Sequence, residues 1–241
     1  MKIKNSVALI TGANRGIGRA LVETFLQHGA ARVYAAARRV ADLDPVVAFD
    51  RKRVHPLQLD VTKPEDLAAA AAKATEVNVL INNAGILDFG GPLEVPTEAL
   101  RRTMETNYYG MLHTTRAFAP AIEANGGGAV VNILTVAALA SLPAIGAYNA
   151  SKAAAWSMTQ ALRADLAKRG IQVFGVFPGP VDTDMSRQIE LPKTAPSDVA
   201  LAVLEGIEAD DEDIFPDPMS KQTYAAWKAD HKAVERRFAS M

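Results

Sequence analysis

The chain alternates short apolar runs with longer helical segments, and this alternation is the feature that most restricts its fold. Six runs are predicted to be strands, several without polar alternation, as in strands covered on both faces: Val7–Thr11, Arg32–Ala37, Val54–Leu59, Val77–Asn82, Ala129–Leu134 and Gln172–Phe177. Between them lie helical patterns at Gly16–His28, Pro64–Thr75, Thr97–Asn125 and Tyr148–Arg169. Strands that alternate with helices form βαβ units with right-handed crossovers. The sequence therefore predicts an α/β fold, with a doubly wound parallel sheet in a three-layer α/β/α arrangement.

The 241 residues show no internal repeat and no dividing linker, so residues 1–241 are predicted to form a single domain. Between the second and third strands only a short helical stretch is expected, at Val40–Phe49, because Pro45 interrupts it. Ile214–Pro218 is a weak candidate for a seventh strand, since its two prolines cannot donate to a β-ladder. A final amphipathic helix is predicted at about 219–240, with inward positions at Tyr224, Trp227, Val234 and Phe238.

Composition argues against several classes of function. The net charge is −1, with 26 basic and 27 acidic side chains, so nothing indicates a nucleic-acid or anionic-membrane partner. The chain has no cysteine, which excludes disulfides, thiolate zinc sites and cysteine nucleophiles; a cytoplasmic location is expected. The four histidines are scattered, so no metal site is predicted. No apolar run approaches the roughly 18 residues of a transmembrane helix.

The first predicted strand runs into a glycine-punctuated turn and then into a helix. Gly12, Gly16 and Gly18 give the spacing G-x-x-x-G-x-G, which differs from the common G-x-G-x-x-G. Glycine lets the backbone approach a phosphate closely, and the following helix N-terminus supplies free N–H groups and a positive dipole end. This arrangement indicates a dinucleotide site. An ATP-type site is disfavoured because no Gly-Lys-Ser/Thr follows the turn.

The end of the second strand indicates which dinucleotide binds. NAD sites usually place an acid about 20 residues after the turn, where it holds the ribose 2′-hydroxyl. Here that position is Ala37, and Arg38 and Arg39 follow it. An arginine suits a 2′-phosphate, and Arg15 in the glycine turn could add a second positive charge. NADP(H) is therefore predicted in preference to NAD(H).

Tyr148 and Lys152 lie four residues apart at the start of a predicted helix and so share one face. A nearby ammonium favours the phenolate, so Lys152 is expected to lower the pKa of Tyr148 from its ordinary value of about 10. A tyrosine with such a pKa can act as a general acid/base near neutral pH. The spacing alone is a weak signal because it occurs by chance in many helices.

With several further motifs in the same order, the chain resembles the short-chain dehydrogenase/reductase superfamily over about three quarters of its length. The motifs are Thr11-Gly12-x-x-x-Gly16-x-Gly18, Asp60 in Leu59–Thr62, Asn82-Asn83-Ala84-Gly85, Asn107, the Tyr148 and Lys152 pair, and Pro178–Thr183. The resemblance implies a Rossmann-like fold. It also implies cofactor-binding roles for Gly12, Asn14, Arg15, Gly16, Ile17, Gly18, Arg38, Asp60, Val61, Asn83, Ala84, Gly85, Tyr148, Lys152, Pro178, Gly179, Val181 and Thr183.

The resemblance further implies an active site of Tyr148, Lys152, Thr135 and Asn107. Tyr148 would exchange the proton, Lys152 would hold the nicotinamide ribose, and Asn107 would support a water linking Lys152 to solvent. The family usually has serine where this chain has Thr135. Threonine keeps a hydroxyl donor but adds a methyl group and a stiffer χ1. Ser141 is the alternative donor, and an inert Thr135 would leave the site crippled.

These residues predict an oxidoreductase that transfers a hydride between NADP(H) and a carbonyl or secondary alcohol substrate. Two alternatives stay open. One is a non-enzymatic NADPH-binding sensor, motivated by Thr135. The other is a non-redox epimerase or dehydratase on the same scaffold, although that class usually carries a longer C-terminal substrate domain.

The substrate is expected to be apolar and of medium size, because Leu, Phe, Ile and Met recur in the expected lining segments Leu87–Gly91, Ala138–Gly146 and Met185–Lys193. Residues 183–196 are expected to form a substrate lid. A homodimer through helices 97–125 and 148–169 is open alongside a monomer.

Overall fold

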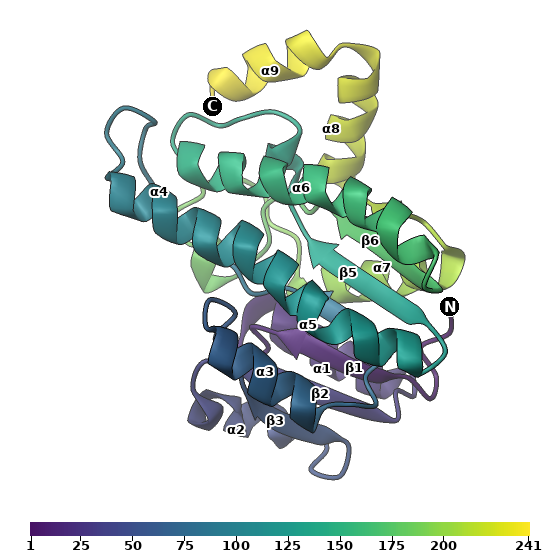
Figure 1. Ribbon diagram of the computed structural model, residues 1–241. Helices are drawn as coiled ribbons and strands as arrows, with labels where there is room; N and C mark the ends of the chain where they lie inside the picture. The colour runs from purple at the N-terminus through teal and green to yellow at the C-terminus, as the bar shows by residue number, and fades with distance from the viewer.

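The computed structural model describes residues 1–241 and is built around one seven-stranded sheet (Figure 1). Its strands are β1 (Val7–Thr11), β2 (Arg32–Ala37), β3 (Val54–Gln58), β4 (Val79–Asn82), β5 (Gly128–Ile133), β6 (Ile171–Val176) and β7 (Asp213–Ile214). They run in the order β3-β2-β1-β4-β5-β6-β7, and every neighbouring pair is parallel. The predicted parallel α/β sheet is confirmed.

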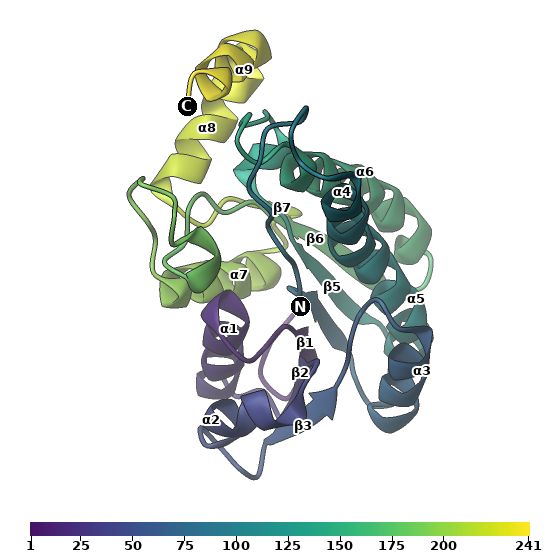
Figure 2. The ribbon, with the colours of Figure 1, turned by 90° about the vertical axis from the view of Figure 1, so that its left-hand side faces the viewer.

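Helices cover both faces of the sheet, which gives the three layers (Figure 2). One face carries α1 (Gly16–Gln27), α2 (Asp44–Val47) and α7 (Pro196–Ala209). The other carries α3 (Pro64–Lys73), α4 (Thr97–Met104), α5 (Gly110–Ala124) and α6 (Gly146–Ala167). The last two helices project beyond the sheet, namely α8 (Pro218–Ala229) and α9 (His231–Ala239). Single helical turns lie at Val40–Leu43, Glu105–Tyr109, Val136–Ala138 and Asp184–Ser186.

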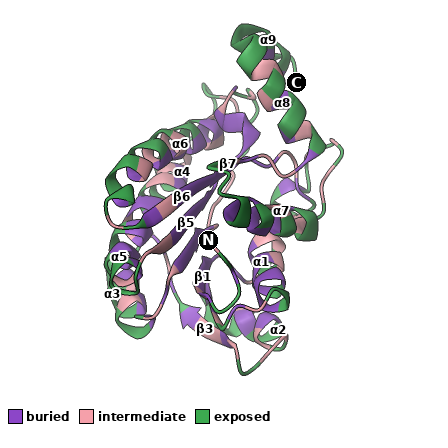
Figure 3. Ribbon diagram, turned by 90° about the vertical axis from the view of Figure 1, so that its right-hand side faces the viewer, coloured by how far each residue is buried: buried purple, intermediate pink, exposed green.

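Strand β1 shows why the apolar runs lack alternation. Ala8 and Ile10 pack in the core beneath α1 and α7, whereas Leu9 packs in the separate core beneath α3 and α5. All three are fully buried, so each face of the strand needs apolar side chains. In Figure 3 most of the central strands are buried, and the helices that cover the sheet are exposed on their outer sides.

The first six strands and the four predicted helices lie within two residues of their predicted ends. The long segment Thr97–Asn125 is continuous, but a π-helical turn at Glu105–Tyr109 joins α4 to α5. Helix α7 was not among the predicted helices. Its apolar residues Val199, Val203 and Ile207 are four apart and pack in the α1 core, so a helical signal was present in the sequence.

The C-terminal region also differs from the expectation of one helix at 219–240. Asp230 has an extended backbone (φ −154) and separates α8 from α9, and its carboxylate caps α9 by accepting a hydrogen bond from Ala233 N at 2.9 Å. Val234 and Phe238 are buried as expected. Of the weak strand candidate Ile214–Pro218, only Ile214 lies in a strand, because β7 is limited to Asp213 and Ile214.

The connection that leaves β1 leads toward one edge of the sheet, through β2 and β3. The connection that leaves β4 leads toward the other edge, through β5 to β7. Parallel α/β sheets bind ligands in the crevice beyond the carboxyl ends of such strands. No helix combines the length and apolar character needed to cross a membrane. Helices α4 to α6 contain the segments considered for a homodimer, and a homodimer and a monomer both stay open.

Candidate active site

A crevice of about 1590 Å³ lies at the carboxyl edge of the sheet and is lined by the segments that follow β1 to β6. Most residues singled out in the sequence line it, namely Gly12, Asn14, Arg15, Gly16, Ile17, Arg38, Asp60, Val61, Asn83, Ala84, Gly85, Thr135, Tyr148, Lys152, Pro178, Gly179, Val181 and Thr183. Gly18 and Asn107 do not line it; both are buried. Since pockets for drug-sized ligands measure about 300–1,000 Å³, this crevice has room for a larger ligand.

The glycine turn depends on the absence of side chains. Gly12 and Gly16 have positive φ angles of 63° and 53°, which favour glycine. A Cβ atom at Gly18 would lie 2.2 Å from the carbonyl oxygen of Gly12. Helix α1 begins directly after Arg15, whose side chain gives no N-terminal cap. The first N–H groups of α1 are therefore suited to hold an anion at this end of the crevice.

Thr11 and Asn83 fasten the glycine turn to the loop after β4. The Thr11 hydroxyl accepts hydrogen bonds from Asn83 N at 2.9 Å and from Ala84 N at 3.0 Å. In return, Asn83 Nδ2 donates to the carbonyl oxygens of Thr11 at 2.8 Å and Gly12 at 3.1 Å. The Asn83 side chain therefore joins the two loops into one unit.

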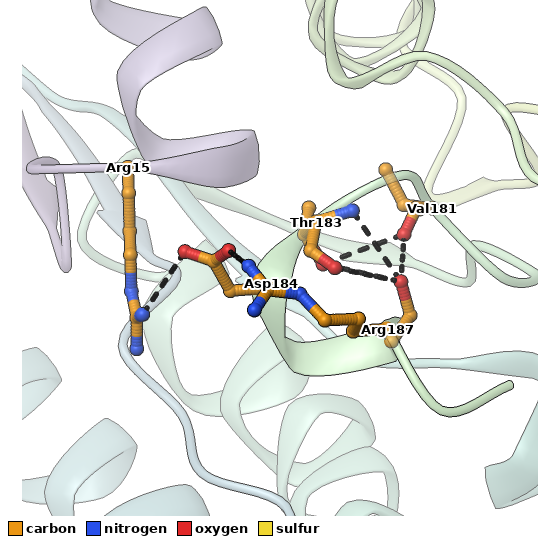
Figure 4. Close-up of polar contacts among 6 residues, drawn as sticks. Arg15, Val181, Thr183, Asp184 and Arg187 are labelled. Carbon is orange, nitrogen blue, oxygen red and sulfur yellow. Dashed lines mark hydrogen bonds and ion pairs between the residues drawn. The ribbon is translucent and has the colours of Figure 1, made fainter.

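Arg15 is held by the start of the segment that follows β6. Its Nη1 lies 3.2 Å from Asp184 Oδ2, and Asp184 also pairs with Arg187 at 2.5 Å (Figure 4). Thr183, directly before Asp184, packs against the glycine turn, since a Cβ atom at Gly16 would lie 3.1 Å from Thr183 Cγ2. Arg15 can therefore contact a phosphate only in competition with Asp184.

The two arginines after β2 differ in their contacts. Arg39 also lines the crevice, but its guanidinium donates to the carboxylate of Asp42 twice, at 3.0 and 2.7 Å. Arg38 is exposed at the crevice wall and makes no ion pair. Of the two, Arg38 is the one available to bind an anion.

Asp60 is fixed within the loop after β3. Its Oδ1 accepts hydrogen bonds from Thr62 N at 3.1 Å and from the Thr62 hydroxyl at 2.7 Å. The neighbouring Val61 packs so closely on α5 that a Cβ atom at Gly110 would lie 2.6 Å from Val61 Cγ2. This loop therefore forms a fixed part of the crevice wall, to which it contributes the acidic Asp60 and the apolar Val61.

The opposite end of the crevice is formed by side chains from α6 and from the end of β5. Lys152 is 5% exposed, its Nζ donates to the carbonyl oxygen of Ile133 at 2.7 Å, and it lies 5.8 Å from the centre of the Tyr148 ring. Thr135 is 7% exposed, and its hydroxyl donates to the carbonyl oxygen of Pro178 at 3.3 Å. Ser141, the alternative donor, is exposed and does not line the crevice.

Burial dominates the acid–base properties at this end. Burial raises the pKa of Tyr148 to about 12, and a hydrogen bond with the Thr135 hydroxyl offsets part of the rise. Burial lowers the pKa of Lys152 to about 8. The expectation that Lys152 lowers the pKa of Tyr148 is therefore wrong for the chain by itself, because burial raises this pKa and the group that lowers it is Thr135. At neutral pH the phenol keeps its proton.

Asn107 lies in the π-helical turn and joins two parts of the site. Its Oδ1 accepts from Ile86 N at 2.9 Å, and its Nδ2 donates to the Ile86 carbonyl at 2.9 Å and to the Ser151 hydroxyl at 3.0 Å. Ser151 in turn donates to the carbonyl oxygen of Tyr148 at 2.7 Å. Asn107 therefore braces the start of α6. The bracing role of Ser151 was not anticipated from the sequence.

Part of the crevice wall is apolar. From the three segments expected to line it, the side chains that do so include Leu87, Leu142, Ile145, Met185, Ile189 and Leu191. Asp88 also lines it, but Arg102 and Thr103 hold its carboxylate at 2.6 and 3.0 Å. Met219 and Phe238, from the last two helices, complete the wall. Sequence periodicity placed Phe238 inward but could not show that it faces a cavity.

These residues fit the nicotinamide dinucleotide predicted from the sequence. The glycine turn leaves a cradle that any Cβ atom would fill, with helix N–H groups and an unpaired arginine where phosphates would lie. Asp60, after β3, and the polar side chains around Tyr148 at the far end can form hydrogen bonds with the other parts of such a ligand.

Comparison with known proteins gives the same assignment. A family model described as short chain dehydrogenase matches residues 6–194. A solved short chain dehydrogenase from Burkholderia cenocepacia J2315, in complex with NADP, is 40% identical over 99% of each chain, with a TM-score of 0.93. The 7alpha-hydroxysteroid dehydrogenase of Escherichia coli (strain K12) is 31% identical over 80% of this chain and 78% of that protein. Cyclohexanol dehydrogenase of Acinetobacter sp. (strain SE19) is 33% identical over 78% of each. The chain belongs to the short-chain dehydrogenase/reductase superfamily of oxidoreductases.

Proposed function

We propose that this protein is an NADP(H)-dependent oxidoreductase that interconverts a carbonyl compound and a secondary alcohol, with Tyr148 as the general acid/base. The observation that supports this most is the two-ended crevice. Tyr148, Thr135 and Lys152 line one end, and the glycine turn and Arg38 line the other. When bound, a nicotinamide dinucleotide supplies or accepts the hydride.

Tyr148 donates its proton to the carbonyl oxygen as negative charge develops there. Its pKa of about 12 keeps the phenol protonated at neutral pH, which is the state that a proton donor needs. The Thr135 hydroxyl turns from the Pro178 carbonyl to donate a second hydrogen bond to the same oxygen, and this contact strengthens as the charge grows.

Lys152 returns the proton to Tyr148 after each turnover in this proposal, because a pKa of about 8 lets it gain and lose a proton near neutral pH. It also holds the nicotinamide ribose. Asn107 keeps the start of α6 in place and supports a water that connects Lys152 to solvent.

Two observations support NADP(H) over NAD(H). Arg38 is exposed and unpaired beside the position where an acid would hold an unphosphorylated ribose. The solved relative that is 40% identical carries NADP. Arg15 would join Arg38 at the 2′-phosphate only after it leaves Asp184.

The apolar wall favours a medium-sized apolar substrate, and two relatives are named for cyclohexanol and for a 7alpha-hydroxysteroid. Both names describe a hydroxyl on an aliphatic ring, so cyclic ketones and their alcohols are the proposed class. Residues 183–196 serve as a substrate lid within a single domain of residues 1–241.

The function is tested by following the absorbance of NADPH and NADH with cyclic and open-chain ketones and aldehydes of increasing size. We expect turnover with cyclic ketones and a preference for NADPH. Tyr148→Phe should lower kcat by about 10²- to 10⁴-fold, because the proton donor is lost, while NADPH binding is retained.

Tyr109→Phe is the matched control, since Tyr109 is exposed and does not line the crevice. A Tyr148→Phe variant as active as this control would contradict the proposed proton donor. NADPH binding without turnover on any carbonyl would favour the sensor. Conversion of a substrate without net change in NADPH would favour an epimerase or dehydratase.

A further inference from the structure

We infer that Asp217 is a positioning residue, which fixes the Pro178–Gly179 turn of the crevice by tying it to the first turn of α8. Its kinetic consequences rest on the proposed function. Asp217 is 2% exposed and does not itself line the crevice, whereas Gly179 and Met219 on either side of it do. The carboxylate therefore acts from behind the wall.

The two carboxylate oxygens of Asp217 serve two different elements. Oδ2 accepts a hydrogen bond from Gly179 N at 2.8 Å, and Oδ1 accepts one from Ser220 N at 2.8 Å. The Ser220 hydroxyl completes a capping box by accepting from Asp217 N at 3.1 Å. A helix cap needs only one side-chain oxygen, so the second is available to hold the turn.

The opposite side of the turn is held by the reactive end of the site. The carbonyl oxygen of Pro178 accepts hydrogen bonds from the Thr135 hydroxyl at 3.3 Å and from Val136 N at 3.1 Å. The turn is thus clamped between Thr135 and Asp217. A shift of the turn toward either side would change where the Thr135 hydroxyl points.

Gly179 is closely packed against Asp217 and Met219. A Cβ atom at Gly179 would lie 3.0 Å from Asp217 Oδ1 and 3.4 Å from the sulfur of Met219. A carboxylate buried this deeply needs its hydrogen-bond donors, which opposes separation of the turn from α8. These contacts make the turn and the start of α8 move as one body.

Helix α8 is a firm anchor because aromatic stacking holds it to the sheet edge. Phe215, just after β7, stacks on Tyr224 of α8 at 4.1 Å and on Phe177 at 5.0 Å between ring centres. Asp217 therefore transmits the position of a packed helix to the turn that closes the crevice, and it also sets where Met219 faces the substrate end.

Two variants separate the positioning role from helix capping. Asp217→Ser keeps a good N-cap residue for α8 but is too short to reach Gly179 as well. Ser220→Ala weakens the capping box and leaves the bond from Asp217 to Gly179 intact. Each is compared with the wild type for melting temperature, kcat, and affinity for NADPH and for 2′,5′-ADP, which has the 2′-phosphate but no nicotinamide.

We expect Asp217→Ser to lower kcat by about 10- to 100-fold and to weaken NADPH binding, because a small displacement near the reacting atoms is costly, and to leave 2′,5′-ADP affinity unchanged. Ser220→Ala should lower the melting temperature yet keep kcat within about twofold. Gly179→Ala should reproduce the Asp217→Ser kinetics. Unchanged kcat and NADPH affinity in Asp217→Ser, or equal loss of both ligands, would overturn the inference.

The proposed function can fail separately from this inference. If the wild type turns over no carbonyl compound, the comparison of NADPH with 2′,5′-ADP still decides the role of Asp217. If the wild type binds neither ligand, the NADP preference is wrong, and the same comparison with NADH and ADP-ribose then decides the role of Asp217.

Discussion

The two ends of the crevice are built in different ways. The end around the glycine turn consists mostly of main chain, since Gly12, Gly16 and Gly18 have no side chains and Asn83 holds the backbone by hydrogen bonds. The far end consists of side chains, with Lys152 buried and Tyr148 partly buried. The glycine end depends on the shape of the backbone, whereas the properties of the Tyr148 end depend on the free-energy cost of burying ionisable groups.

The difference implies different responses to mutation. Filling a space at the glycine end should harm folding and ligand binding together, because backbone and binding surface are the same atoms. At the far end function opposes stability, since a buried ammonium is poorly solvated. Substitutions there should separate activity from stability.

The largest effect is expected at the glycine end, from Gly18→Ala. The added Cβ would lie 2.2 Å from the Gly12 carbonyl oxygen and 2.6 Å from Asn83 Nδ2, so the turn and the loop after β4 must separate. We expect the free energy of unfolding to fall by about 3 kcal/mol, although alanine is the better helix former, and cofactor binding to be lost.

Urea denaturation and cofactor titration measure these two losses. Gly146→Ala is the control, because a Cβ atom there meets nothing closer than 3.5 Å. If Gly18→Ala were as stable as this control, the glycine end would not be limited by shape.

At the far end, Lys152→Met should raise stability while it abolishes turnover. The pKa of Lys152 falls from 10.5 to about 8 on burial, so at neutral pH the folded protein holds an unfavourable charge. Replacing it with an apolar side chain of similar length should raise the free energy of unfolding at pH 7 by about 1–3 kcal/mol. Lys168→Met, at the exposed position directly after α6, is the control and should change little.

The pH dependence gives a second check on Lys152. Between about pH 8 and pH 10 the unfolded chain keeps this proton and the folded protein has lost it, so wild-type stability should rise with pH. The advantage of Lys152→Met should therefore shrink from pH 7 to pH 9.5. A constant difference would mean that the ammonium is not penalised by burial.

The same division explains what the sequence could predict. Gly12, Gly16 and Gly18 are local requirements of the backbone, so the turn, its strand and its helix were predicted closely. The direction of the Tyr148 pKa was predicted wrongly, because residue spacing reveals a neighbouring charge but not the loss of solvent around it. Asp217 and Met219 are 39 and 41 residues beyond Pro178, and only the folded chain brings them beside that turn.

A smaller effect is expected from the exposed cations at the glycine end. Arg38→Ala should weaken NADPH binding by about 10-fold relative to NADH, since one charge-assisted contact to the 2′-phosphate is lost in a solvent-exposed position. Arg39→Ala should change this ratio much less, because Asp42 already pairs with Arg39. Titration of both cofactors measures the ratio, and equal effects of the two variants would contradict the assignment to Arg38.

The smallest effect is expected from Thr135→Ser, which removes one methyl group. Serine keeps the hydroxyl that accepts from Ala137 N at 3.2 Å and donates to the Pro178 carbonyl, so the local fold should not change. The freer χ1 should let the hydroxyl turn toward the substrate oxygen, and kcat should rise by about two- to fivefold.

Thr135→Val keeps the bulk and loses the donor, so it should lower kcat by about 10²-fold. Steady-state kinetics of the pair therefore distinguishes crowding from hydrogen bonding, and full activity in Thr135→Val would show that the hydroxyl has no part in turnover.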